Sequence, residues 1–326
     1  MRIAVLRALQ LGDLLCAVPA LRALRGAFPQ ARIALAGLAW ARAFAARFRR
    51  YIDEFIEFPG LPGTSAFFDD MRSRAFDLVV QMHGDGSQTN AVALAMGGER
   101  TAGFYLPGAQ CPDPARFVEW RAEENEVVRC LRLVERLGAR SSSAELEFPL
   151  FESDWAEWRA LGVRDYVCVH AGAQLPSRRW PPGRFAVVAD ALAADGLRVV
   201  LTGSAAEAGI TRRVAHAMRG PSLDLAGRTS LGALGALIAR ARLVLCNDTS
   251  ISHIAAAMRT PSVVICCGAD PRRWAPLDRA LHRVLYHDVE CRPCMHVECP
   301  IGHPCALGVS VAAVKQEVSR MLACAA

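Results

Sequence analysis

The sequence predicts an α/β protein made of two doubly wound domains, each a parallel sheet flanked by helices. Three observations lead to this fold class. Short apolar and β-branched runs alternate with longer alanine- and leucine-rich stretches. This alternation occurs twice, before and after a serine- and proline-containing stretch at residues 138–150. The length of 326 residues also corresponds to about two domains of ordinary size.

The first half opens with an apolar run, and Gly12 and Asp13 mark a turn into a long helix. The stretch GARSSSAELEFPL (138–150) has the serine and proline content of a linker. We therefore place the domain boundary there, which gives domains 1–150 and 151–326. We expect strands at 2–7, 32–37, 51–58 and 76–82, and helices ending near 28, starting near 38, and at 65–75 and 124–137.

The second half repeats the pattern. Ligands of open parallel sheets lie beyond the carboxyl ends of the strands, so we expect the active site in the cleft between the two domains. We expect strands at 166–170, 197–203, 223–227, 243–247 and 262–267, and helices at 181–194, 231–241 and 310–323, with two more that end at 218 and 258.

Composition excludes several classes of protein. With 52% hydrophobic and 21% charged residues, the chain is neither disordered nor collagen-like. No secretion signal and no membrane-spanning segment are expected, so the cytoplasm is the expected compartment. We expect most of the twelve cysteines to be small buried apolar residues, and we do not expect a disulfide framework.

The net charge of +6 comes almost wholly from arginine, because Lys315 is the only lysine. Arginine suits phosphate recognition. The arginines are scattered and aromatic residues make up only 7%, which argues against a nucleic-acid partner. The charge is compatible with an anionic membrane surface. The first strand is not followed by G-x-G-x-x-G, so NAD or FAD chemistry is disfavoured.

Asp13 lies in LGDLL (11–15), where the first strand gives way to a helix. Two interpretations are open. Aspartate is a preferred helix N-cap, and the residue alone favours that structural role. A carboxylate at the end of a strand can also accept a proton from a sugar hydroxyl as a general base.

HAGAQLPSRRWPPGRF (170–185) is a candidate phosphate loop. Its small residues permit close backbone approach, the following helix supplies N–H groups, and Arg178 or Arg179 can offer a guanidinium fork. A solvated arginine beside a packed Trp180 explains the same residues equally well.

Two further loops of similar polarity follow later strands. CNDTSISHIAAAM (246–258) puts Asp248, Thr249, Ser250 and His253 at a helix start, where capping and phosphate binding use the same groups. GADPRRW, which begins at Gly268, follows the next strand. Three such loops in one domain favour a nucleotide diphosphate site.

These segments, in this order, resemble glycosyltransferase family 9, the ADP-heptose:lipopolysaccharide heptosyltransferases. The resemblance is carried by LGDLLCAVPALRALRGAFPQARI, HAGAQLPSRRWP, VLTGSAAE, DLAGRTSL, NDTSISHIAAA and GADPRRWAP, spread over nearly the whole chain. It implies a GT-B fold, with two Rossmann-like domains facing a central cleft. The first domain would bind the acceptor and the second ADP-heptose, and the reaction would invert the anomeric carbon.

Site residues follow from the resemblance one by one. Asp13 would be the general base on the acceptor hydroxyl, with Gly12 beside it. His83, after the last clear strand of the first domain, would contact the acceptor; the alternative is a turn histidine held by backbone. In the second domain the donor site would use Arg178 or Arg179 near the departing ADP, together with Asp248, Thr249, Ser250, His253 and Gly268. No metal is chemically required. Two departures from the family pattern are Ser250-Ile251-Ser252 and Cys267.

The implied partners are a nucleotide-sugar donor and an anionic, lipid-linked saccharide acceptor, reached by peripheral association at the cytoplasmic face of the inner membrane. Two alternatives stay open. One is a family-9 transferase that acts on a protein or another glycan, and the other is a noncatalytic nucleotide-binding scaffold.

Four cysteines cluster in CRPCMHVECPIGHPC (291–305), with the spacing C-x2-C-x4-C-x5-C. Such a set permits zinc or iron binding. The alternative is a thiol-rich insert that packs against the C-terminal helix. The four are Cys291, Cys294, Cys299 and Cys305.

Overall fold

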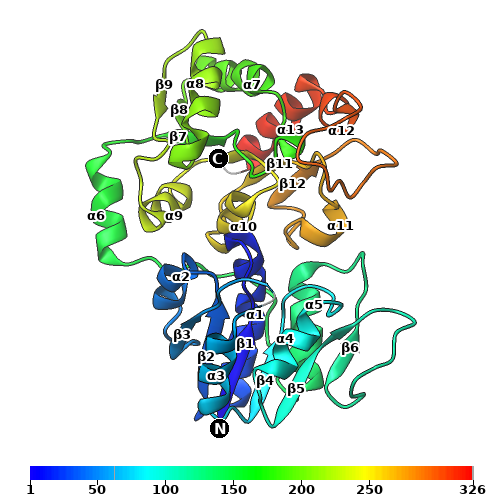
Figure 1. The fold of residues 1–326 in the computed structure, drawn as a ribbon. Coiled ribbons are helices and arrows are strands. Elements are labelled where there is room, and N and C mark those ends of the chain that lie inside the picture. The colour runs from blue at the N-terminus through cyan, green and yellow to red at the C-terminus, as the bar shows by residue number, and fades with distance from the viewer. Residues whose placement is uncertain (62, 325–326) are drawn as a thin grey trace. The chain divides into compact units, whose positions relative to one another are not determined.

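Two six-stranded sheets, in which every neighbouring pair is parallel, organise the chain (Figure 1). The computed structural model describes residues 1–61 and 63–324. The chain divides into two compact units, Met1–Pro149 and Leu150–Ala326, with one sheet in each. The predicted fold class is confirmed.

The sheet of the first unit has the strand order β3-β2-β1-β4-β5-β6. Crossover helices between parallel strands explain why strands and helices alternate in the sequence. The elements are β1 (Arg2–Leu6), α1 (Leu11–Ala27), β2 (Arg32–Gly37), α2 (Ala41–Arg47), β3 (Glu54–Glu57), α3 (Ser65–Ser73), β4 (Leu78–Gln81), α4 (Thr89–Ala95), β5 (Arg100–Tyr105), β6 (Phe117–Glu119) and α5 (Glu126–Arg136).

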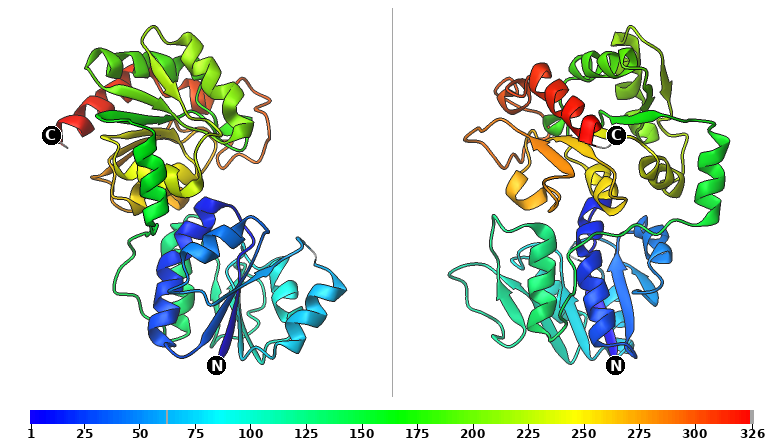
Figure 2. Two further views of the ribbon diagram at one scale, coloured as in Figure 1. Left: turned by 90° about the vertical axis from the view of Figure 1, so that its left-hand side faces the viewer. Right: turned by 180° about the vertical axis from the view of Figure 1, so that it is seen from behind.

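Helices cover both faces of this sheet (Figure 2). Alternate residues of β1 point to opposite faces. Ala4 and Leu6 join a core cluster that includes Phe67 and Met71 of α3. Helix α1 packs beside α5. Because both faces are covered, β1 is apolar at every buried position, as parallel strands usually are.

The sheet of the second unit has the order β12-β11-β10-β7-β8-β9. Two short 3-10 turns, Pro176–Arg178 and Ala205–Glu207, follow β7 and β8. The other elements are α6 (Glu152–Ala160), β7 (Tyr166–His170), α7 (Pro182–Ala194), β8 (Arg198–Leu201), α8 (Ala208–Ala217), β9 (Ser222–Asp224), α9 (Leu231–Ala239), β10 (Val244–Asn247), α10 (Ser250–Ala257), β11 (Ser262–Ile265), α11 (Pro271–Trp274), β12 (His282–Leu285), α12 (Pro304–Leu307) and α13 (Val311–Cys324).

The main core of the second unit lies between its sheet and helices α7, α8 and α13, with Val167 and Val169 of β7 at its centre. Trp180 is fully buried there, and its indole N–H donates to the Val309 carbonyl at 3.0 Å. On the other face, the Tyr166 hydroxyl donates to the Leu237 carbonyl of α9 at 2.7 Å. Buried polar atoms of these aromatic residues are therefore satisfied.

Seven helices and strands in the described part of the chain were absent from the sequence-based expectation: α4, β5, β6, α6, α11, β12 and α12. Strand β5 contains Gly103, where an added Cβ would lie 3.1 Å from the Gln81 Cβ. A glycine inside a strand weakens the apolar pattern, although here it allows close packing of neighbouring strands. Strand β6 is only three residues long, too short for a periodic signal. The strand predicted at 51–58 is shorter, covering Glu54–Glu57.

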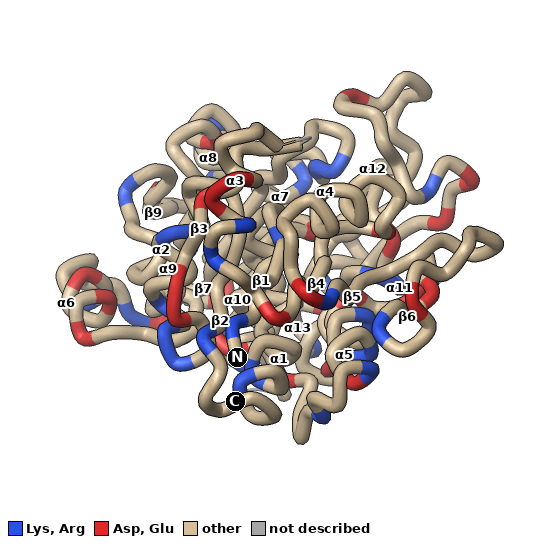
Figure 3. Tube along the Cα trace, turned by 60° about the horizontal axis from the view of Figure 1, so that its bottom comes forward, with Lys and Arg blue, Asp and Glu red and all other residues tan. Residues whose placement is uncertain are grey.

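Charged residues are interspersed over the chain rather than gathered in blocks (Figure 3). Within residues 1–61 and 63–324, no helix has the length and apolar character that a membrane crossing needs.

Candidate functional site

In each sheet the winding direction reverses beside the first strand of the unit. Strand β1 lies between β2 and β4, and β7 lies between β8 and β10. Loops leave such a switch point in opposite directions, which opens a binding crevice at the carboxyl ends of the strands. The predicted site residues follow β1 and β4 in the first unit, and β7, β10 and β11 in the second.

Asp13 lies in the first turn of α1 and is half-buried, as is its neighbour Gly12. Its Oδ2 accepts the backbone N–H of Gln10 at 3.2 Å. The N-cap of α1 is therefore Gln10 and not Asp13, which is the third helical residue and accepts the N-cap N–H as in a capping box. An ionised carboxylate has about four acceptor positions, so one capping bond does not prevent Asp13 from also acting on a ligand.

Arg7, at the end of β1, connects the loops on both sides of the switch point. Its Nε donates to the Asp13 carbonyl at 2.8 Å, Nη1 donates to the Met82 carbonyl, and Nη2 donates to Glu126 at 3.0 Å. The side chain is only 1% exposed. Burial disfavours the charged guanidinium, but Cys130, Glu126 and Asp13 raise the pKa of Arg7 above its ordinary value. Sequence reasoning missed this residue, although an arginine that ends a buried strand was a usable signal.

His83 follows β4 and faces the loop that leads to α1. Its Nδ1 accepts the Ala8 backbone N–H at 3.3 Å, so the proton of the neutral ring is assigned to Nε2. Burial, followed by the charge of Arg7, lowers the pKa of His83 to about 4. The ring is therefore neutral near pH 7. The structure brings Asp13 and His83 to the same edge of the first sheet.

Asn247 holds together the loops of the second unit. This fully buried side chain at the end of β10 accepts the Trp180 backbone N–H at 2.9 Å and donates to the Ala171 carbonyl at 2.8 Å. It also donates to the Gly172 carbonyl at 3.3 Å. The loop that carries the arginine pair is thus fixed to the neighbouring strand.

The two arginines of this loop have different surroundings. Arg179 donates to the carbonyls of Ala173 and Gln174 at 2.8 and 3.3 Å, so it stabilises its own loop. Arg178 packs near Gly268, where an added Cβ would lie 3.7 Å from the Arg178 Cγ. Its buried Nε has no hydrogen-bond partner. Of the pair, Arg178 is the one associated with the loop after β11.

Asp248 follows β10 and lies close to Arg178. Burial raises the pKa of Asp248 to about 6, although Arg178, the Cys266 thiol and Arg292 each lower it. The Cys266 thiol is 3.8 Å from Asp248 Oδ2, and the Arg292 Nη1 is 3.5 Å from the same sulfur. Asp248 therefore belongs to a mixed acidic, thiol and basic cluster that joins the loops after β7, β10 and β11.

Helix α10 begins beside this cluster. Thr249 is its N-cap and accepts the Ile251 N–H at 3.3 Å, and half-buried Ser250 is its first residue. His253 lies one turn later, is buried, and packs against Trp274 with ring centroids 6.4 Å apart. Thr249 and Ser250 thus lie at the sheet edge, while His253 contacts α11.

A second carboxylate at this edge was not anticipated. Glu207 Oε2 accepts the N–H and the hydroxyl of Ser204 at 2.8 and 2.9 Å, and lies 3.9 Å from His170 Nε2. Burial lowers the pKa of His170, against the opposing effect of Glu207. An added Cβ at Gly172 would lie 2.1 Å from Glu207 Oε1, so any side chain there would displace the Glu207 carboxylate from its present place. The acidic residue four positions after Gly203 in VLTGSAAE was the available signal.

The four clustered cysteines do not gather around one point. Cys294 and Cys305 are buried, Cys299 is half-buried and Cys291 is exposed. Among the residues that the structure describes, no three histidine, cysteine or acidic side chains are grouped to hold a metal ion. The segment instead binds neighbouring loops, for example through the Cys294 N–H, which donates to the Gly268 carbonyl at 2.7 Å.

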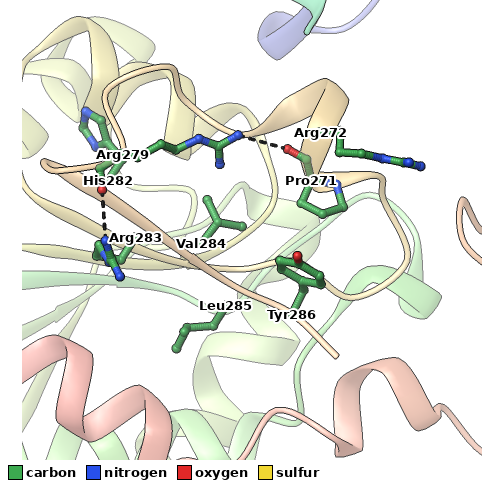
Figure 4. Close-up of a pocket in the computed structure, with 8 residues that line it drawn as sticks. All are labelled: Pro271, Arg272, Arg279, His282, Arg283, Val284, Leu285 and Tyr286. Carbon is green, nitrogen blue, oxygen red and sulfur yellow. Dashed lines mark hydrogen bonds between the residues drawn. The ribbon is translucent and has the colours of Figure 1, made fainter. Parts of the chain in front are cut away.

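A separate pocket of about 310 Å³ lies beside β12 and contains none of the predicted site residues (Figure 4). Its charged members already have protein partners: Arg272 pairs with Asp270 at 3.0 Å and Arg283 with Glu317 at 3.2 Å. Arg279 reaches across to the Pro271 carbonyl at 3.5 Å. The predicted donor residues are therefore grouped at the loops after β7, β10 and β11 and not in this pocket.

Comparison with known proteins gives a family match. The model of the family described as "Glycosyltransferase family 9 (heptosyltransferase)" matches residues 64–304. Lipopolysaccharide heptosyltransferase 3 of Escherichia coli is 34% identical over 158 residues, which cover 46% of this chain and 46% of that protein. That alignment thus spans less than half of the relative. Lipopolysaccharide heptosyltransferase 2 of E. coli is 24% identical over 85% of this chain and 86% of its own length.

Solved structures share the fold over nearly the whole chain. The structure of E. coli ADP-heptose lps heptosyltransferase II has a TM-score of 0.79 and 21% identity, and the match covers 99% of both chains. An E. coli heptosyltransferase solved with ADP has a TM-score of 0.67 and 18% identity, covering 98% of this chain and 97% of that chain. The two Rossmann-like units are thus those of the GT-B fold.

Replacing Arg7 by methionine should strongly destabilise the first unit. Removal of the guanidinium leaves the Met82 and Asp13 carbonyls without this donor and removes one cation from buried Glu126, so we expect a loss of about 2–4 kcal/mol in the free energy of unfolding. Urea denaturation followed by circular dichroism measures it. Arg32→Met is the matched control, since its pair with Glu54 is largely exposed and should contribute less than about 1 kcal/mol. Equal losses in the two variants would contradict the role assigned to Arg7.

Asp248 should make the stability of the second unit depend on pH. Its pKa is higher in the folded protein than the ordinary value of 3.8, so the native state binds more protons than the unfolded state between about pH 4 and 6. The free energy of unfolding of the parent should therefore fall relative to that of Asp248→Asn as pH rises through this window, by about 3 kcal/mol, which thermal melts at several pH values measure. A difference between parent and variant that stays constant with pH would rule out the raised pKa.

Proposed function

The chain belongs to glycosyltransferase family 9, and from this membership we propose that it transfers heptose from ADP-heptose to an inner-core lipopolysaccharide acceptor. One observation supports the donor half most directly: Arg178, Asp248 and the N-terminus of α10 are grouped at the carboxyl edge of one sheet. A guanidinium and the positive end of a helix are groups that favour the binding of a diphosphate. The E. coli heptosyltransferase with ADP shares the fold of this chain.

The second unit is assigned to the donor. Arg178 binds the diphosphate, and the backbone around Gly268 lies close to it. The first turn of α10, which begins at Ser250, directs its partial positive charge toward the same group. Glu207, at 18% exposure beside glycine backbone, suits a pair of sugar hydroxyls such as those of ribose.

The first unit is assigned to the acceptor. Asp13 is held by the Gln10 N–H and, through its carbonyl, by Arg7. As the acceptor oxygen attacks the anomeric carbon, Asp13 takes the hydroxyl proton and a new C–O bond forms. The bond from the anomeric carbon to the diphosphate breaks, and ADP leaves with the bonding electrons. Arg178 and the α10 N-terminus offset the charge that develops on ADP. This single displacement inverts the anomeric carbon.

The acceptor in this proposal is anionic and lipid-linked, so the enzyme works at the cytoplasmic face of the inner membrane. The net charge of +6 favours approach to an anionic surface. His83, whose neutral ring presents Nε2–H as a donor, is the proposed acceptor contact beside Asp13 and Gly12.

Replacing Asp13 by asparagine should separate its catalytic role from its capping role. Asparagine keeps an oxygen that can accept the Gln10 N–H but cannot take the acceptor proton, so the transfer rate should fall by about 100-fold or more while the Kd for ADP stays unchanged. Product formation by mass spectrometry and ADP binding by calorimetry measure the two. Asp113→Asn, which replaces another carboxylate that accepts a backbone N–H in the first unit, should keep the parental rate. Transfer by Asp13→Asn at the parental rate would exclude Asp13 as the base.

The arginine pair provides a matched test of the donor site. Arg178→Met should weaken ADP binding about 10- to 100-fold, the range expected for charge-assisted hydrogen bonds. Arg179→Met should weaken it by less than about fivefold, because Arg179 binds its own loop. Calorimetric titration with ADP gives both values. The reverse ranking would assign the phosphate contact to Arg179.

A further inference from the structure

Ser177, the residue directly before Arg178, has all three of its polar groups bound by the cysteine-rich segment 291–305. Its backbone N–H donates to the Val297 carbonyl at 3.0 Å, and its hydroxyl donates to the His296 carbonyl at 2.6 Å. Its own carbonyl accepts from His303 Nε2 at 2.8 Å. The residue is 2% exposed. Its backbone is therefore fixed from outside its own loop, next to the arginine assigned to the diphosphate.

The same segment also holds the loop after β11. Besides the Cys294 N–H, which binds the Gly268 carbonyl at 2.7 Å, the Arg292 guanidinium donates to the Ala269 carbonyl and, at 3.4 Å, to the Cys266 carbonyl. An added Cβ at Gly268 would lie 3.0 Å from the Cys294 Cβ. Two of the three proposed donor loops are thus attached to one segment, which forms the orange loop before α12 in Figure 1.

His303 has a backbone conformation that suits this contact. Its φ of 62° lies in the left-handed region, which is uncommon for residues other than glycine. Its N–H donates to the Cys299 sulfur at 3.1 Å. Because the Ser177 carbonyl can only accept, the His303 Nε2 must carry the proton. Strained backbone of this kind persists where surrounding contacts determine it.

We propose that Ser177 and His303 are positioning residues, through which the cysteine-rich segment fixes the place of Arg178 in the donor site. The inference rests on the proposed function, since it concerns the same site. The two residues act through Arg178 and do not themselves touch the donor. Small displacements of a binding group are costly in affinity and rate, so loss of the contact between His303 and the Ser177 carbonyl should weaken the donor complex.

The test compares three histidine variants of the full chain by calorimetric titration with ADP. His303→Ala removes the donor and should weaken ADP binding about five- to tenfold, the effect of one hydrogen bond. His303→Gln places an amide N–H near the position of Nε2 and should bind within about twofold of the parent. His216→Ala, at an exposed histidine of α8, is the matched control and should not change the Kd. In transfer assays, His303→Ala should raise the KM for the donor and leave the KM for the acceptor unchanged.

Hydrogen exchange supplies a readout that needs no nucleotide. The Ser177 amide, which donates to Val297, should exchange faster in His303→Ala than in the parent and at the parental rate in His303→Gln. Unchanged exchange, faster exchange without a change in ADP affinity, or equal losses in the alanine and glutamine variants would each overturn the proposal. If the parent fails to bind ADP, the proposed function fails, and the exchange rates alone then decide whether the segment fixes this loop.

Should His303→Ala not fold, Ser177→Ala replaces it, because that variant removes only the hydroxyl bond to the His296 carbonyl. The same two readouts apply, with weaker ADP binding and faster amide exchange in the loop supporting the proposal and parental values overturning it.

Discussion

The side-chain amide of Asn247 is the interaction on which the second unit's site depends. Asn247 can donate and accept at once, and it is buried at the end of the strand that neighbours β7. The oxygen fixes Trp180 and the nitrogen fixes Ala171, so both ends of the loop that carries Arg178 are attached to one group. Without these bonds the loop would sample many conformations. Ordering it on ligand binding would then cost conformational entropy and weaken the binding through Arg178. Rigid placement of Arg178 begins with this amide.

The two units repeat one topology. When each unit's strands are numbered from its own first strand, both sheets have the order 3-2-1-4-5-6, read from opposite ends. The switch point therefore falls between the first and fourth strands in each. Asp13 and His83 lie at the first of these points, and Arg178 and Asp248 at the second. A carboxylate follows the first strand of one unit, whereas a phosphate-type loop follows the first strand of the other. The same architecture thus carries two different chemistries, set by the loops.

Sequence reasoning predicted the residues whose pattern is local. The strand at 166–170 and the strand at 32–37 match the structure residue for residue, because continuous apolar runs define buried parallel strands. Asp13 and the three polar loops were identified because each directly follows such a strand. The roles assigned to these residues remain proposals.

Residues that act across the fold could not be predicted in this way. Arg7 contacts Glu126, which lies 119 positions away, and Ser177 contacts His303 across 126 positions. A short stretch of sequence gives no sign that two residues so far apart in the chain will contact each other. The clustered cysteines are another case. Their spacing permitted either a metal site or a thiol-rich insert, and in the described residues no three candidate metal ligands are grouped, while the backbone of the segment binds the proposed donor loops. Spacing alone does not say whether a segment folds on itself or around its neighbours.

The division of the chain at residue 149 has a consequence for biosynthesis. All six strands and the covering helices of the first sheet come from one uninterrupted stretch, Met1–Pro149, although its central strand is the first to be made and its edge strand β6 the last. Parallel sheets of high contact order fold slowly. Translation of the second unit at roughly 5–20 residues per second takes about 9–35 s, and during this time the amino-terminal sheet can fold on the ribosome.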